Sequence, residues 1–363
     1  MRRYLLATTF LAFALPAAAQ TFTVSASGGF AAPDGQHWNM RGLNAGVQDA
    51  LQGFPNVLTD FPGLTAIRLN VNPSSDSAAS ISQVVSEYTA AGVAVEIEDH
   101  SGNGDNVAWY QQEAQQFKTN GLVFLETPNE PSGSAQQVAQ DQTGIIKAIR
   151  ATGFANPIGV QPVGGFDQSN IPGVTAAVGT ANLYVTPHIY YDGTDPNGAA
   201  NYVQSEIGQA QSNGLFPVID EFGNALDGVN QNPQGNSVIA SVVAADNAGE
   251  AGAIFWGMDN GNHSDGADSP FATPDGSKLT PIGQQLQSSF LAPQTPSTVR
   301  LTSNPTVAFP AVVPPSVAPT PSGAIAPTFQ ATPSADAQPA LMPVILPPAP
   351  QFAAEPQVAV SPL

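Results

Sequence analysis

The sequence contains no cysteine, so no disulfide can cross-link the chain. Basic residues are also scarce: Lys and Arg together number 9 against 28 Asp and Glu, and the formal net charge at pH 7 is −19. Nucleic acids and anionic membrane surfaces bind clusters of Lys and Arg, so neither is expected as a partner. A chain of 363 residues without disulfides must rely on a large hydrophobic core, and it is long enough to build one.

The sequence also lacks an apolar run long enough to span a bilayer, so no membrane span is expected. Two arginines precede an apolar stretch at residues 4–15, which is too short to cross the hydrocarbon core. Small residues at 17–19 then match a signal-peptidase site. We predict a signal peptide over 1–19 and export to the periplasm or the medium. The alternative is a buried N-terminal helix.

Proline is unevenly distributed. Of the 34 prolines, 17 lie between residues 291 and 363, a stretch that holds only three charged residues. Proline at this density blocks both helices and sheet ladders. The stretch 291–363 is therefore predicted to be a disordered or polyproline-like tail that acts as a spacer, an anchor or an inert extension.

Acidic residues outside the tail stand singly beside Gly, Asn or Pro, which is typical of solvated loops. A calcium site at Asp259, Asp265 and Asp268 is the alternative for one such loop, although the spacing matches no known calcium loop. The sequence has no H-E-x-x-H motif and no cysteine ligand, so a His/Glu metal site is not supported.

Residues 20–290 predict one domain in which β-rich apolar runs alternate with helical patterns. Eight runs have strand composition, and they cover residues 38–44, 66–72, 93–100, 122–131, 158–165, 183–191, 217–224 and 253–260.

Most gaps between these runs hold an amphipathic pattern that ends at a glycine. The stretch 78–92 shows this clearly, because its apolar residues recur at helical spacing and Gly92 follows. The gap at 166–179 is weaker. Eight strand and helix units in about 250 residues predict an α/β fold of the (β/α)8 TIM barrel type. A doubly wound open sheet is the alternative, but no G-x-G-x-x-G follows any strand.

Polar and aromatic residues collect at the predicted strand ends, where the active site of a parallel barrel lies. They are Arg68 and Asn70, Asp99 and His100, Asn129 and Glu130, His188 and Tyr190, Asp220 and Glu221, and Trp256. Glu130 and Glu221 close the fourth and seventh runs and are predicted to face each other. Two facing carboxylates suit glycoside hydrolysis, in which a protonated acid donates to the leaving oxygen and an ionised one attacks the anomeric carbon.

Other rim residues fit supporting roles. Arg68, His188 and Tyr190 are candidates for keeping the nucleophile ionised. Asn129 is a candidate donor to the sugar 2-hydroxyl, and Trp256 offers a flat face to a sugar ring. Strand alternation predicts that Asp220 points away from the site.

Each candidate has a structural alternative. Either glutamate can be a solvated loop acid, and Arg68 can belong to a structural ion pair. His100 and the other rim histidine can be satisfied core residues, while Tyr190 and Trp256 can be ordinary packing. The partners of Glu96 and Glu98 in the third run stay open.

The motif set resembles glycoside hydrolase family 5. The matching residues are Arg68, His100, Asn129-Glu130-Pro131, His188-Ile189-Tyr190, Glu221 in "VIDEFG", and Trp256. The resemblance extends from "DGQHWNMRGLN" to "LTPIGQQLQSSF" and leaves out the tail. It implies a retaining endo-β-glycosidase, expected to be a monomer without a cofactor, in which Glu130 is the acid/base and Glu221 the nucleophile.

The expected substrate is a β-1,4-glucan, because cellulases of the family share this motif set. Mannan, xylan or another β-glycan is the alternative. Two readings from other classes are a non-catalytic sugar-binding or cell-surface protein, and an envelope-associated protein whose role lies in the proline-rich tail.

Overall fold

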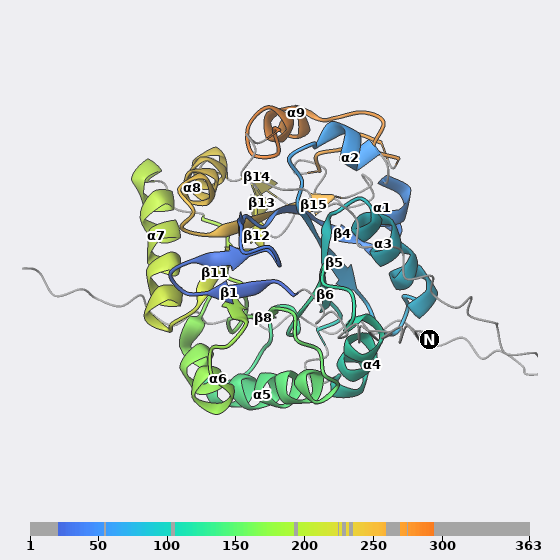
Figure 1. Ribbon diagram of the computed structural model, residues 1–363. Helices are drawn as coiled ribbons and strands as arrows, with labels where there is room; N and C mark the ends of the chain where they lie inside the picture. Colours follow the sequence, from blue (N-terminus) through green and yellow to red (C-terminus); the bar gives the residue numbers. More distant parts are fainter. Residues whose placement is uncertain are drawn as a thin grey trace, which may run out of the picture. The chain divides into compact units, whose positions relative to one another are not determined.

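The computed structural model describes residues 21–53, 56–102, 106–191, 195–223, 225–226, 230–231, 235–258, 269–273 and 275–293 (Figure 1). These residues belong to one of two units of the chain, Met1–Ala308, whereas the second unit is Phe309–Leu363. The predicted signal peptide and the tail from residue 294 onward lie outside the described residues, as does the acidic loop at 259–268.

Eight parallel strands close into a barrel in the order β11-β15-β4-β5-β6-β7-β8-β9. Their bounds are β4 Arg41–Gly46, β5 Ala66–Val71, β6 Ala94–Asp99, β7 Val123–Glu126, β8 Ile158–Val160, β9 Leu183–Val185, β11 Phe216–Ile219 and β15 Gly252–Met258. The strands are rich in buried apolar residues because both faces of a parallel sheet are covered. The predicted (β/α)8 barrel and all eight of its strands are confirmed.

Several predicted strand boundaries are wrong: the fifth and sixth barrel strands end early, at Val160 and Val185, and two other differences move Trp38 and Glu130 out of the barrel strands. The first barrel strand begins at Arg41, and Trp38 belongs instead to β3 (His37–Trp38). The fourth strand ends at Glu126, so Glu130 lies four residues beyond it in a loop and not at the strand tip. In both places the sequence next to the strand is itself buried, so burial alone does not mark where the ladder ends.

Helices surround the strands, as Figure 1 shows in a view roughly down the axis of the barrel. They are α1 Val47–Gly53, α2 Asn56–Asp60, α3 Ala78–Ala90, α4 Val107–Phe117, α5 Ala135–Ala151, η1 Gln168–Asn170, α6 Ile171–Val178, α7 Pro196–Ser212, α8 Gly235–Asn247 and α9 Pro281–Ser288. Ser77 and Ser134 cap α3 and α5 by accepting from backbone N–H groups. Gly92 follows α3 with a φ of 76°, which confirms the predicted glycine stop. The weak fifth helix is short, as expected.

An antiparallel sheet of three short strands closes the amino-terminal end of the barrel. It consists of β1 (Thr23–Ser25), β2 (Gly29–Ala31) and β3. Phe30 and Trp38 from this sheet pack against Phe124 and Phe216, which lie near the starts of β7 and β11. This aromatic cluster fills the amino-terminal end, so the carboxyl end of the barrel is the end available for a site.

Two further short pairs extend the barrel strands. β10 (His188–Ile189) runs parallel to β12 (Glu221–Phe222), with His188 in register with Glu221. β13 (Ala225–Leu226) pairs with β14 (Asn230–Gln231). Within the described ranges, none of the helices combines the length and hydropathy that a bilayer crossing requires.

Candidate active site

Arg68 lies at the centre of the site, on β5, and is fully buried. Its Nε donates to Glu126 Oε2 (2.7 Å), and its Nη1 donates to Asn44 Oδ1 (2.9 Å) and Glu221 Oε1 (2.8 Å). Its Nη2 donates to Asn129 Oδ1 (2.8 Å). Burial alone would lower the pKa of the guanidinium, but the surrounding carboxylates raise it well above its ordinary value. Arg68 therefore stays charged and holds residues from three other strands and from the loop after β7.

Glu221 is held by strand pairing as well as by charge. The β10–β12 pair sets its side chain beside His188, whose Nδ1 lies 3.3 Å from Glu221 Oε2. The Tyr190 hydroxyl donates to the same oxygen at 3.4 Å, while Arg68 binds the other oxygen. The Glu221 side chain is only 6% exposed. One fixed positive charge and two further partners therefore hold both oxygens of this carboxylate in place.

Glu130 has a different environment. Its side chain is 42% exposed, and its backbone φ is 40°, in the left-handed region that a residue with a Cβ seldom adopts. His188 Nδ1 contacts its Oε1 at 2.8 Å. Burial would raise the pKa of the Glu130 carboxyl, but its hydrogen bond with His188 lowers it below the ordinary value. One oxygen of Glu130 lies within 4.8 Å of one oxygen of Glu221.

Gly165 makes room for the contact between His188 and Glu130. It follows β8 with a φ of 80°, and its carbonyl accepts from the His188 N–H at 2.8 Å. A Cβ at this position would lie 2.8 Å from His188 Nδ1 and 3.0 Å from Glu130 Oε1. Phe166 follows, 40% exposed, and its ring meets the edge of His188 with 6.3 Å between centroids. The loop after β8 therefore borders the Glu130 side of the site.

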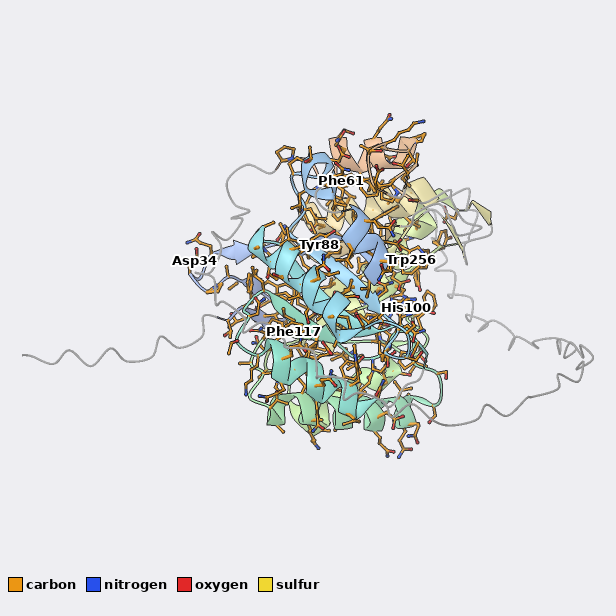
Figure 2. All side chains as sticks on the ribbon, turned by 90° about the vertical axis from the view of Figure 1, so that its right-hand side faces the viewer. Asp34, Phe61, Tyr88, His100, Phe117 and Trp256 are labelled. Carbon is orange, nitrogen blue, oxygen red and sulfur yellow. The ribbon has the colours of Figure 1, made fainter. Side chains whose placement is uncertain are left out.

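His100 and Trp256 form a second part of the rim. Their rings stack with centroids 5.6 Å apart and planes 15° apart, and Figure 2 labels both. His100 Nδ1 pairs with Glu98 Oε1 at 2.8 Å. Burial would lower the pKa of His100, but the charge and hydrogen bond of Glu98 raise it. This pairing gives Glu98 a partner and fixes the imidazole beside the tryptophan.

All eight predicted site residues thus lie at one end of the barrel. Hydrogen bonds or ion pairs of Arg68 and His188 join Asn129, Glu130 and Glu221, and Tyr190 joins through Glu221. His100 and Trp256 connect to them through Glu98, whose Oε1 is 3.9 Å from Arg68 Nη2. Arg68 Nη2 holds Asn129 by its oxygen, so the amide N–H₂ group faces away from the guanidinium.

The prediction that Asp220 points away from the site is wrong. Asp220 Oδ2 lies 3.0 Å from Arg68 Nε and 3.2 Å from Gln161 Nε2. The reason is local: β11 ends at Ile219 and β12 begins at Glu221, so Asp220 falls in the break between them and strand alternation does not apply.

Sequence reasoning also missed three residues of the network, Asn44, Glu126 and Gln161. Each is a buried polar residue on or directly after an apolar strand, and that isolation was the available signal. Gln161 Nε2 donates to Glu126 Oε1 at 2.6 Å and lies 3.0 Å from His188 Nε2. Glu96, whose partner the sequence left open, accepts from the Tyr184 hydroxyl.

Four carboxyl groups lie within 4.0 Å of one guanidinium, and like charges this close disfavour one another. Burial and the charge of Glu126 raise the pKa of Asp220 well above its ordinary value, and burial likewise raises that of Glu96. Burial would also raise the pKa of Glu126, but Arg68 and a hydrogen bond from Asp220 lower it. Protonated Asp220 therefore donates to ionised Glu126.

Two groups of three side chains within the described ranges bring potential metal ligands together. One is Glu130, His188 and Glu221, and the other is Glu96, Glu126 and Asp220. Arg68 already supplies a positive charge to both groups, and a cation would compete with it. The residues proposed for calcium, at 259–268, lie outside the described part of the chain.

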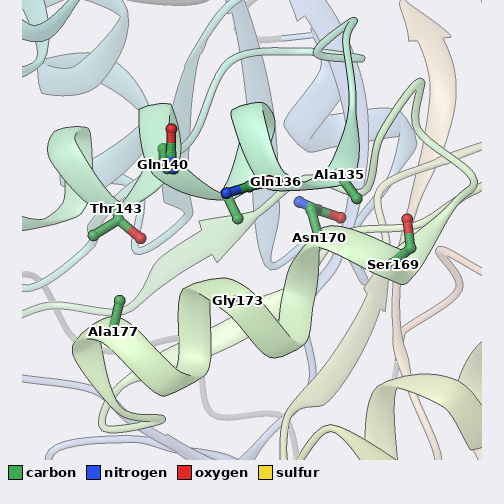
Figure 3. Close-up of a pocket in the computed structure, with 9 residues that line it drawn as sticks. Ala135, Gln136, Gln140, Thr143, Ser169, Asn170, Gly173 and Ala177 are labelled. Carbon is green, nitrogen blue, oxygen red and sulfur yellow. The ribbon is translucent and has the colours of Figure 1, made fainter.

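A separate hollow of about 460 Å³ lies between α5 and α6 (Figure 3). Small and uncharged side chains line it, among them Ala139, Thr143 and Gly173. It contains no titratable side chain, so it offers no acid–base chemistry.

A closed (β/α)8 barrel with two carboxylates at its carboxyl end is the arrangement of many glycosidases. The family model "Cellulase (glycosyl hydrolase family 5)" matches residues 57–262. The chain belongs to glycosyl hydrolase family 5 and is a glycosidase. The resemblance seen in the sequence is confirmed.

Solved structures of similar fold include both mannanases and cellulases. The β-mannanase from Thermomonospora fusca has 20% identity and a TM-score of 0.61, covering 79% of this chain and 98% of its own. The mannanase catalytic domain from Streptomyces sp. SirexAA-E has 19% identity and a TM-score of 0.60, covering 83% and 99%. The endoglucanase catalytic domain from Thermobifida fusca has 20% identity and a TM-score of 0.57, covering 74% and 97%. A comparison with curated proteins finds no match.

Proposed function

We propose that the protein is a retaining endo-β-glycanase that cleaves a β-1,4-linked polysaccharide by double displacement. Glu221 attacks the anomeric carbon while Glu130 protonates the leaving oxygen, and a covalent glycosyl-enzyme forms. Glu130 then acts as a base and activates the water that releases the sugar. The observation that carries the proposal is the approach of the two carboxylates, whose nearest oxygens lie within 4.8 Å. Retaining enzymes hold their carboxyl groups about 5–5.5 Å apart, whereas inverting ones leave about 6.5–9.5 Å for a water.

The environments of the two carboxylates support this division of roles. Glu221 is buried, and Arg68 and Tyr190 bind its two oxygens, so the attacking carboxylate is held in a fixed position. Glu130 is half-exposed, so it can reach the leaving oxygen and later a water molecule. Asn129 presents its amide group for a sugar hydroxyl, Trp256 forms a flat wall on one side, and Phe166 offers a second aromatic face beside Glu130.

We further propose that residues 20–290 form the catalytic domain of an exported protein, with a cleaved leader at 1–19 and a proline-rich extension at 291–363. The basic start, short apolar run and small-residue site support the leader. The proposed substrate is a β-1,4-glucan, as in the cellulases that name the family model, and the β-1,4-linked mannan is its closest competitor because mannanases share the fold. The strongly negative charge suits a neutral polysaccharide.

The test measures reducing ends released from carboxymethylcellulose, β-mannan and xylan by the wild type, Glu130→Gln, Glu221→Gln and the control Glu250→Gln. Glu250 is exposed, lies outside the site, and accepts a hydrogen bond from Gln204 of α7 at 3.0 Å. We expect Glu130→Gln to lose about 10²–10⁴-fold in kcat, Glu221→Gln to lose essentially all activity, and the control to match the wild type. Full activity in both site variants would refute the proposal.

Two further measurements separate the two roles. An aryl glycoside with a strongly acidic phenol as leaving group needs no protonation, so Glu130→Ala should still form the glycosyl-enzyme and show a burst of phenol. Glu221→Ala should not. The first-formed sugar of the wild type should keep the β configuration by NMR, whereas an α product would mean inversion and would contradict the nucleophile assignment.

A further inference from the structure

The amide of Gln161 determines where the proton of His188 resides. Gln161 follows β8, is fully buried, and its Nε2 faces three polar atoms. These are Glu126 Oε1 at 2.6 Å, His188 Nε2 at 3.0 Å and Asp220 Oδ2 at 3.2 Å. Glu126 is ionised because Arg68 binds it at 2.7 Å. A carboxylate oxygen at 2.6 Å requires a donor, so the nitrogen end of the amide, and not its oxygen, must point to Glu126.

This orientation fixes the tautomer of His188. The amide nitrogen carries two hydrogens, and one is used by Glu126. Of the two remaining atoms, His188 Nε2 is the nearer at 3.0 Å, and Asp220 Oδ2 at 3.2 Å already lies 3.0 Å from Arg68 Nε, which supplies it with a donor. The second hydrogen therefore points to His188 Nε2, which must accept. Asp220 Oδ1, the other candidate partner of Nε2, lies 3.6 Å away, beyond hydrogen-bond distance.

We propose that Gln161 is a positioning residue that holds His188 in the Nδ1–H tautomer and thereby directs the acid proton of Glu130 onto Oε2. His188 Nδ1 lies 2.8 Å from Glu130 Oε1 and 3.3 Å from Glu221 Oε2. An N–H at this position donates to Oε1, so Oε1 must be the unprotonated oxygen of the acid. The proton of Glu130 then occupies Oε2, where it is available to a leaving group.

The opposite tautomer would misdirect the same proton. With a bare Nδ1, the protonated Glu130 would donate from Oε1 to the imidazole, and the proton would be held by the enzyme instead of the substrate. The inference rests on the proposed roles of Glu130 and Glu221, but the tautomer itself does not. The polar groups that face His188 are Glu130 from the loop after β7, Asp220 and Glu221 from β11–β12, and Gln161.

The experiment reads the tautomer directly. Full-length protein is labelled with ¹⁵N-histidine, and two-bond ¹H–¹⁵N spectra distinguish the protonated from the bare ring nitrogen of each neutral histidine. The chain has four histidines, and the signal that disappears in His188→Gln belongs to His188. We expect wild-type His188 to carry its proton on Nδ1. A wild-type spectrum with the proton on Nε2 would overturn the proposal without any variant or substrate.

Two variants of similar size test the cause. Gln161→Glu places an oxygen against His188 Nε2 and should move the proton to Nε2, whereas Gln161→Met offers no polar group and should remove the preference. For both we expect kcat to fall about tenfold or more with KM little changed, because a misdirected proton affects the transfer step. Gln168→Met, at a buried glutamine that contacts Glu206, is the matched control and should retain kcat and tautomer.

The outcomes are distinguishable. If either folded variant keeps the Nδ1–H tautomer and full kcat, Gln161 does not position His188. If the tautomer changes as expected but Glu130→Gln and Glu221→Gln keep activity, the proposed catalytic roles fail and the tautomer assignment stands. If the variants do not fold, the wild-type spectrum still decides the tautomer.

Discussion

Glu113 carries a carboxyl group that the folded protein stabilises only in its neutral form. It lies on the inner face of α4 and is 1% exposed. Neither carboxylate oxygen has a hydrogen-bond partner among the described residues. Burial raises the pKa of Glu113 from 4.5 to about 7. A carboxyl whose pKa rises on folding contributes stability below its ordinary pKa, and that contribution is lost as the pH rises through the folded value.

The magnitude follows from the two pKa values. The difference between 4.5 and about 7 corresponds to roughly 3 kcal/mol of unfolding free energy, lost between about pH 4.5 and pH 7. Glu113→Gln keeps the shape of the neutral acid and cannot ionise. We therefore expect the variant to match the wild type near pH 4.5 and to exceed its stability by roughly 3 kcal/mol at pH 8, which corresponds to about 10 °C in Tm.

Urea unfolding and thermal melts at both pH values measure this gap. Gln111→Glu, on the exposed face of the same helix, is the control and should change stability by no more than about 0.5 kcal/mol. An equal stability of wild type and Glu113→Gln at pH 8 would refute the reasoning. It would mean that the buried carboxylate gains a compensating partner when it ionises.

Three shorter predictions concern activity. Gly165→Ala should reduce kcat at least about tenfold, because the added Cβ pushes His188 away from Glu130 and the φ of 80° disfavours a residue with a Cβ. Circular dichroism verifies that the variant folds, and an unchanged kcat would count against the role of the His188–Glu130 contact. His188 lowers the pKa of Glu130, so His188→Ala should move the alkaline limb of kcat/KM to higher pH, and a move to lower pH would contradict this. Phe166→Ala should raise KM for polysaccharide several-fold without lowering Tm, because the ring is 40% exposed; an unaltered KM would exclude it from the binding surface.

The barrel could be predicted from the sequence because its signal is local. Each strand is a short apolar run, and most of the following helices show one apolar face and end before a glycine with positive φ, as at Gly92 and Gly153. The position at which a strand ends depends on residues that are distant in the sequence, so it is harder to predict. Trp38 looks like part of a barrel strand because it is apolar, but it packs into the aromatic cluster at the other end of the barrel.

The site was predictable only where a residue has a recognisable motif. Glu130 and His188 stand in such motifs, whereas Gln161 stands alone after an apolar run. Its partners Glu126 and Asp220 lie 35 and 59 positions away along the chain, and strand register decides that they meet. The prediction for Asp220 is wrong for a related reason. Alternation along a strand does not tell which way a side chain points once the strand is interrupted, and Asp220 lies between β11 and β12.

The crowding of acids around Arg68 explains why the two catalytic candidates differ. Arg68 lies 2.7 Å from Glu126 and 2.8 Å from Glu221, while burial and the charge of Glu126 raise the pKa of Asp220. Glu130 lies outside this arrangement and depends on His188 instead. Glu126 and Glu221 share the guanidinium of Arg68, whereas Glu130 does not. A substitution at Glu126 should therefore disturb the electrostatic environment of Glu221 more than the environment of Glu130. Arg68 and its buried partners contact the proposed nucleophile, whereas His188 and Gln161 act on the proposed acid, so we expect the two roles to be perturbed separately.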